Sequence, residues 1–200
     1  MSQHDWTPFA LLLVDLQEGF WSLEMAEQFP DFPASVMRLL SFCRDQGIEV
    51  IHLRAGFEAD MSDWMVRYKL RGRIPCVRGT PGADVLPFAR EQPGEAVIVK
   101  SSFDGFLNPE LLAHLRQGKK RFLLTAGLIT SVCVLLTTAS AAQCGFLTAV
   151  VEDCCADDLQ AHKYTLERYP FIFERTTVDG LPGHHARWMG ELEHLASLEP

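Results

Sequence analysis

The sequence predicts an α/β protein whose mostly parallel sheet of about six strands is covered by helices on both faces. Short, continuous apolar runs such as Phe9–Val14 are typical of strands that are buried on both sides. These runs alternate along the chain with longer segments in which apolar residues recur at helical spacing. Strands that alternate with helices favour parallel pairing through helical crossovers.

Each expected strand is an apolar run of strand length that polar, glycine or proline residues bound. The expected strands are Phe9–Val14, Ile48–Leu53, Ala96–Val99, residues 121–126, Phe146–Val151 and a short sixth strand, Phe171–Phe173.

The expected helices begin and end at residues with known capping preferences. Pro33–Asp45 places apolar side chains at helical intervals, and Gly47 ends it. Asn108–Arg116 opens on Asn-Pro-Glu, which combines a cap with proline at the first helical position. Further helices are expected from Thr130 up to Gly145, over Asp157–Tyr169 and over Ala186–Leu195.

Length and composition limit the kind of protein. Two hundred residues fit one domain spanning 1–200, and 48% hydrophobic with 22% charged residues is ordinary for a soluble protein. The net charge of −8 and the lack of a long basic run make nucleic acid an unexpected partner. The first apolar run ends at Asp15 without a preceding Lys or Arg, so we expect neither a signal peptide nor a membrane span.

The six cysteines form no C-x-x-C pair and no evident disulfide framework. Reduced thiols and a cytoplasmic location are the simplest interpretation. The cysteine and histidine spacings fit no zinc-ligand pattern. The chain also contains no G-x-G-x-x-G, which argues against a dinucleotide or flavodoxin-like nucleotide site.

Three chemically distinctive side chains each follow directly after an expected strand: Asp15, Lys100 and Cys133. The carboxyl ends of parallel strands meet at one edge of the sheet, where such folds bind ligands. We therefore predict that the three side chains lie together. Each has an ordinary alternative, namely a capping Asp, a solvated strand-end Lys and a buried structural Cys.

The segment around Cys133 gives this prediction its chemistry. An apolar run over 121–126, a break at Gly127 and a helix from Thr130 place Cys133 in the first turn of that helix. The N–H groups there lack intrahelical partners, and the helix dipole is positive. We therefore expect the pKa of the Cys133 thiol to lie below that of a free cysteine.

Four motifs in order resemble the isochorismatase-like cysteine hydrolases, which include nicotinamidases, carbamoylsarcosine amidohydrolases and other small-amide hydrolases. They are LLLVDLQEGF with Asp15, RGTPGAD, VIVKSSFDGF with Lys100, and AGLITSVCVLLTTASAAQCGF with Cys133. The likeness spans nearly the whole chain. It implies a Rossmann-type, three-layer αβα sandwich, an Asp–Lys–Cys triad and a non-proline cis peptide at Leu128–Ile129.

The resemblance also implies roles for single residues. Asp15 would take the thiol proton, and Cys133 would attack an amide-like carbonyl to form a thioester. The N–H groups of Ile129 and Cys133 would form the oxyanion hole, with Lys100 as the neighbouring cation. Phe20 would line the substrate pocket.

The segment from Glu58 to Pro75 has no clear period and is the least informative part of the chain. It could roof a pocket, with Trp64 as a substrate-binding wall residue. A surface loop anchored by one tryptophan is equally compatible with the pattern.

One departure from the family concerns metal. Nicotinamidases of the family carry a metal-binding Asp-x-His after the second strand. The matching positions are Ala55 and Phe57, which cannot ligate a metal, while His52 lies within the strand and is expected in the core. We expect neither metal nor cofactor.

The sequence leaves other functions open. An isochorismatase-type vinyl ether hydrolase shares the fold, as would a non-catalytic binding protein. A Cys–His hydrolase lacks a suitable histidine, since His184 and His185 fall in an expected loop. The favoured hypothesis is a cofactor-independent cysteine amidohydrolase that acts on a small carboxamide or ureido compound. Family habit favours a homo-oligomer, without specifying the number of subunits or the substrate.

Overall fold

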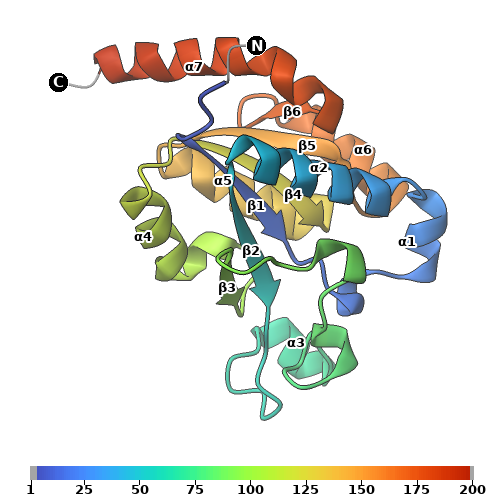
Figure 1. The fold of residues 1–200 in the computed structure, drawn as a ribbon. Coiled ribbons are helices and arrows are strands. Elements are labelled where there is room, and N and C mark those ends of the chain that lie inside the picture. The colour runs from blue at the N-terminus through green and yellow to red at the C-terminus, as the bar shows by residue number, and fades with distance from the viewer. Residues whose placement is uncertain (1–3, 199–200) are drawn as a thin grey trace.

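The sheet has six strands in the order β3-β2-β1-β4-β5-β6, and every neighbouring pair is parallel. The structure is a computed structural model in which residues 4–198 are described. It confirms the predicted α/β class (Figure 1). The strands are β1 (Phe9–Val14), β2 (Glu49–Ala55), β3 (Ala96–Lys100), β4 (Phe122–Leu128), β5 (Leu147–Ala156) and β6 (Glu174–Thr176).

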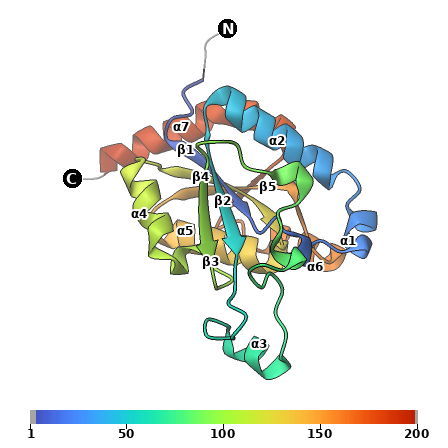
Figure 2. The same cartoon turned by 60° about the horizontal axis from the view of Figure 1, so that its bottom comes forward.

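Helices cover both faces of this sheet, as Figure 2 shows: α2 and α7 lie on one side, and α4, α5 and α6 lie on the other. The small helix α3 stands apart, beyond the carboxyl end of β2. The helices are α1 (Leu23–Gln28), α2 (Phe32–Gln46), α3 (Val66–Arg71), α4 (Pro109–Gln117), α5 (Leu135–Gln143), α6 (Leu159–Arg168) and α7 (Leu181–Leu198). None of the helices within residues 4–198 has the length and apolar character to cross a bilayer.

The central strands β1 and β4 form the middle of the core. Every residue of both strands is buried, which is the burial that their continuous apolar sequences predict. On the α7 side, the Phe122 ring packs between Phe9 and Trp188, with centroid separations of 4.9 and 4.6 Å. Aromatic packing of this kind contributes beyond the burial of area alone, so it fixes α7 firmly on the sheet.

Three predicted boundaries were wrong. Strand β5 continues to Ala156 and does not end at Val151. The last strand pairs through Glu174–Thr176 and not Phe171–Phe173, because an apolar run near the sheet edge can pack without pairing. Phe173 is buried in the core, whereas Phe171 is exposed. Helix α7 begins at Leu181 and not Ala186, since proline is tolerated in a first helical turn.

The earlier start of α7 changes the setting of the two histidines that were expected in a loop. His185 is buried on the helix, where its Nε2 lies 2.9 Å from the Asp5 carbonyl oxygen. Its ring also contacts Trp6, with centroids 4.4 Å apart. His185 is therefore part of the packing between α7 and the N-terminal segment.

Gly127 is the position in β4 where the fold excludes any side chain. Its φ is +127°, and a Cβ there would lie 2.0 Å from the Val14 carbonyl oxygen of β1. We expect Gly127→Ala to lower the free energy of unfolding by about 3 kcal/mol or more, because both strain and overlap with backbone oppose it. Urea unfolding would measure the change.

Gly145 provides the matched control. Its φ of +92° is also left-handed, but a Cβ there meets no atom within 4 Å. Gly145→Ala should cost only about 1–2 kcal/mol from the backbone term. Equal costs at the two positions would contradict the close approach between β1 and β4.

Candidate active site

Asp15 follows β1 directly and is fully buried. Its φ of +50° turns the chain sharply at the sheet edge, a conformation that aspartate adopts more readily than most residues. The Asp15 N–H donates to the Leu53 carbonyl oxygen of β2 at 2.8 Å. Backbone pairing between β1 and β2 thus fixes the position of the Asp15 backbone, from which the carboxylate projects.

Lys100 ends β3 and reaches the Asp15 carboxylate across β2. Its Nζ lies 2.7 Å from Asp15 Oδ2 and donates to the Ser102 carbonyl oxygen at 2.8 Å. The register partner of Lys100 on β2 is Ala55, whose small side chain leaves room for the lysine stem. The two charged side chains are 1% and 0% exposed.

Burial sets the electrostatics of this ion pair. Loss of solvent raises the pKa of Asp15, and the Lys100 ammonium opposes the rise. Removing one member of such a buried pair would leave an uncompensated charge, which is far more costly than losing both. Lys100 and Asp15 therefore depend on each other.

Cys133 lies in a π-helical turn, Thr130–Val134, that precedes α5. The Ile129 carbonyl oxygen accepts the N–H groups of Val132 and Val134 at 3.1 and 3.3 Å, which widens this turn. The peptide bond Leu128–Ile129 is cis, as the family resemblance implied. Cys133 is 5% exposed and lies beside Asp15 and Lys100.

The predicted lowering of the Cys133 pKa was wrong. Burial raises the pKa of the Cys133 thiol above its ordinary value, and the neighbouring Asp15 carboxylate raises it further. The Lys100 ammonium and the Ile129 N–H act in the opposite direction but are outweighed. The start of a helix favours a thiolate when solvent reaches the sulfur, whereas the Cys133 thiol is buried. The resting sulfur is a thiol beside a carboxylate base.

A small cavity of about 20 Å³ opens above these three side chains. Aromatic and aliphatic residues form most of its wall, and Phe20 is among them as predicted. The lining consists of Asp15, Phe20, Ala55, Phe57, Met65, Tyr68, Ile74, Pro75, Lys100, Ser102, Phe103 and Cys133. The structure thus brings the predicted triad together at one small cavity.

Comparison with known proteins assigns the chain to a family. A family model described as the Isochorismatase domain matches residues 9–176. The chain belongs to the isochorismatase family. The family comprises hydrolases, so the chain is a hydrolase with this family's fold and an Asp–Lys–Cys cluster at the sheet edge.

Relatives agree with the family assignment. Isochorismatase family protein YddQ of Bacillus subtilis is 28% identical over 149 residues, covering 74% of this chain and 77% of the relative. Ureidoacrylate amidohydrolase RutB of Variovorax paradoxus is 25% identical over 169 residues, 72% of this chain and 67% of its own. An isochorismatase family protein from Desulfovibrio vulgaris superposes with a TM-score of 0.82 at 26% identity, over 90% of this chain and 98% of the other.

Part of the cavity wall comes from the segment that the sequence left undefined. Met65 and Tyr68 close the cavity from the short segment around α3. Trp64 does not line the cavity: its indole N–H donates to the Glu58 carbonyl oxygen at 2.6 Å, and its ring packs with Phe57 and Cys76. Trp64 belongs to the apolar cluster against which Met65 and Tyr68 pack.

Met65 and Tyr68 could not be identified from the sequence because the segment has no helical or strand period. Phe103 offered a clearer signal, since it lies three residues after Lys100 within the motif VIVKSSFDGF.

Apolar residues occupy the two positions that the family resemblance matches to a metal-binding Asp-x-His. Ala55 and Phe57 are both buried, and no group of three metal-ligating side chains occurs within residues 4–198. His52 is buried as expected, with its Nε2 2.9 Å from Glu95 Oε2. Glu95 also accepts from Arg44 of α2 at 2.8 and 3.0 Å, so His52 belongs to a polar network between β2 and α2.

The buried ion pair predicts a pH-dependent stability. In Lys100→Met, Asp15 loses its cation, so its folded pKa should rise further above the unfolded value of about 4. The folded state then binds more protons than the unfolded state, and the free energy of unfolding falls as pH rises through this interval. We expect a loss of about 3–5 kcal/mol at pH 7, measured by urea unfolding between pH 4 and pH 8.

The double variant Lys100→Met/Asp15→Asn is the control. It removes both charges while keeping the volumes, and we expect it to recover much of the lost stability and to lose the pH dependence. A double variant as unstable as Lys100→Met would show that packing, and not charge, causes the loss.

The reversed sign of the Cys133 pKa can be tested by alkylation. Wild-type Cys133 should react with iodoacetamide more slowly than the half-buried Cys144 across pH 5–9, followed by peptide mapping. Asp15→Asn removes the carboxylate that raises the thiol pKa and leaves Lys100 beside it, so labelling of Cys133 at pH 7 should accelerate by about tenfold. Slower labelling in Asp15→Asn would contradict this electrostatic account.

Proposed function

We propose that this hydrolase cleaves the C–N bond of a small, uncharged carboxamide or ureido compound through a thioester on Cys133. The observation that carries the proposal is the buried Lys100–Asp15 ion pair beside the Cys133 thiol at one small cavity. A buried carboxylate that is kept ionised by a lysine is suited to remove a thiol proton. The relative RutB, a ureidoacrylate amidohydrolase, supports the reaction class.

The first half of the reaction forms the thioester. Asp15 takes the proton from Cys133 as the sulfur attacks the carbonyl carbon, and the Ile129 and Cys133 N–H groups donate to the oxyanion. The tetrahedral intermediate collapses with breakage of the C–N bond. The leaving amine or ammonia takes the proton from Asp15 as it departs.

The second half regenerates the enzyme with the same groups. Asp15 removes a proton from water, which attacks the thioester carbon, and the carboxylic acid leaves as the thiol is restored. Lys100 remains cationic throughout, holds Asp15 ionised between steps and stabilises the developing negative charge.

The charge of the substrate follows from the cavity lining. Lys100 and Asp15 are its only charged members among the described residues, and they bind each other. The cavity wall offers no second cation for a substrate carboxylate, which would be costly to bury without a partner. Aromatic residues such as Phe20 and Phe103 instead suit an apolar acyl group.

The roof must open to admit any such compound. A cavity of about 20 Å³ holds little more than one water molecule. None of the residues of α3 is buried, so displacement of this segment disrupts little packing. We propose that Met65 and Tyr68 move outward on substrate entry.

We also propose a cytoplasmic location. All six cysteines are free thiols, and several of them are buried in the core, which suits a reducing compartment.

Ammonia release from a panel of amides tests the proposal. Isobutyramide and benzamide should be hydrolysed with a kcat/KM at least about 100-fold above that for ureidoacrylate, which carries a carboxylate. Hydroxylamine should trap the acyl group as a hydroxamate. Cys133→Ala should abolish turnover, whereas Cys144→Ala, outside the cavity, should retain it. A preference for the carboxylate substrate, or turnover by Cys133→Ala, would refute the proposal.

A further inference from the structure

The turn that carries Cys133 is held from behind by two side chains of the segment after β5. Asp157 Oδ2 accepts the Ser131 N–H at 2.8 Å. His162 Nδ1 lies 2.8 Å from Thr130 Oγ1, within hydrogen-bond distance. Ser131 and Thr130 both lie between Ile129 and the nucleophile. Two independent contacts thus act on one short stretch of backbone.

Asp157 is a buried carboxylate that accepts two backbone N–H groups. It is 6% exposed, and its second oxygen accepts the Asp158 N–H at 2.8 Å. The first N–H groups of a helical turn lack partners within the turn, and Asp157 supplies one from another element. Burying a carboxylate is costly unless hydrogen bonds satisfy it, and Ser131 is one of its two backbone donors.

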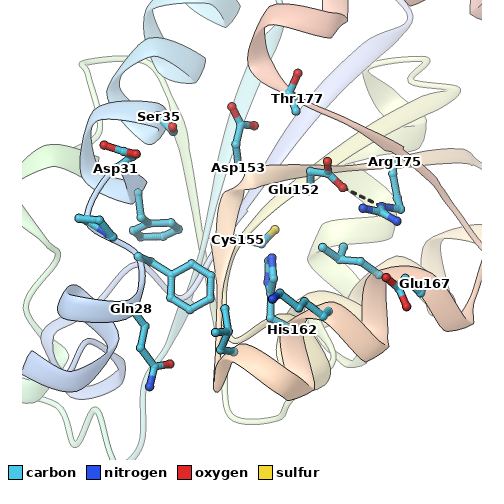
Figure 3. A pocket seen from close by; sticks show the side chains of 16 residues that line it. Gln28, Asp31, Ser35, Glu152, Asp153, Cys155, His162, Glu167, Arg175 and Thr177 are labelled. Atoms are coloured by element: carbon cyan, nitrogen blue, oxygen red, sulfur yellow. Dashed lines mark hydrogen bonds and ion pairs between the residues drawn. The ribbon is translucent and has the colours of Figure 1, made fainter.

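His162 lies in the first turn of α6 and faces the cavity between α1, β5 and α6, as Figure 3 shows. This cavity has a volume of about 410 Å³ and is separate from the one above Cys133. The Phe29 ring meets the imidazole edge-on, with centroids 5.0 Å apart. Burial lowers the pKa of His162, so a neutral imidazole holds the Thr130 hydroxyl near neutral pH.

The same stretch orients both donors of the oxyanion hole in the reaction proposed above. The Ile129 carbonyl oxygen already accepts two N–H groups of the turn. The backbone of the turn is therefore held both by its own hydrogen bonds and by the contacts with Asp157 and His162. Neither Asp157 nor His162 lines the cavity above Cys133. Their contacts can therefore affect the reaction only through the backbone of the turn.

We infer that Asp157 and His162 are positioning residues, which hold the backbone of residues 129–133 so that its N–H groups meet the oxyanion. This inference rests on the proposed function. Misplacement of reacting groups by about 1 Å can cost on the order of 100-fold in rate. Because substrate binding uses other residues, the loss falls on kcat and leaves KM nearly unchanged.

Isosteric and conservative variants provide the test. Asp157→Ala, Thr130→Val and His162→Phe each remove one contact, and we expect kcat to fall by about 10–100-fold with KM within about twofold. Asp157→Asn and Thr130→Ser retain a hydrogen-bonding oxygen at each position, so kcat should return to within about threefold of the wild type.

A control variant removes a similar bond elsewhere on β5. Thr148→Val removes a buried hydroxyl that donates to the Ile172 carbonyl oxygen at 2.7 Å. It should lower the melting temperature and leave kcat unchanged. A fall in kcat as large as that of Asp157→Ala would show a merely structural role and overturn the inference.

Amide hydrogen exchange supplies a readout that needs no substrate. In Asp157→Ala and Thr130→Val, exchange in peptides covering residues 129–134 should accelerate by about tenfold, and Thr148→Val should not show this. Unchanged exchange would refute the positioning role whatever the activity. If the wild type hydrolysed no amide while exchange behaved as expected, the proposed reaction would fail and the anchoring of the turn would stand.

Discussion

The buried ion pair of Lys100 and Asp15 links the end of β3 to the end of β1 across β2, at the edge of the sheet where Cys133 also lies. Each charge is tolerable in the interior only because the other lies 2.7 Å away. Cys133 lies beside this pair, and burial, reinforced by the Asp15 carboxylate, raises the pKa of its thiol. The sharp turn at Asp15 and the small Ala55 on β2 both help to keep this pair buried and in register.

Much of this arrangement could be predicted from the sequence. Continuous apolar runs identified the central strands, since β1 and β4 are buried along their whole length. The rule that parallel strands gather their carboxyl ends at one edge then placed Asp15, Lys100 and Cys133 together without any homologous structure. The order of the four motifs added the family, and the matched residues 9–176 confirm it.

The remaining features depend on tertiary context. The sign of the Cys133 pKa follows from burial beneath a roof, which no local pattern reveals. Trp64 looked like a wall residue because it is the large aromatic in an irregular segment, but Met65 and Tyr68 occupy that place. Asp157 and His162 were included in an expected helix, and only the folded chain shows that they reach the turn of residues 130–134. Edge strands such as β6 are set by pairing more than by composition.

The roof has a consequence for how this protein could diversify. The side chains of the proposed triad come from strand ends and from the turn before α5, whereas much of the cavity wall comes from the single segment between β2 and β3. Insertions, deletions and exchanges in that segment leave the sheet register and the ion pair intact. In the proposed reaction, selectivity and reactivity thus depend on separate parts of the chain. A lineage with this architecture can acquire new substrates by exchanging one surface segment while inheriting an unchanged catalytic apparatus.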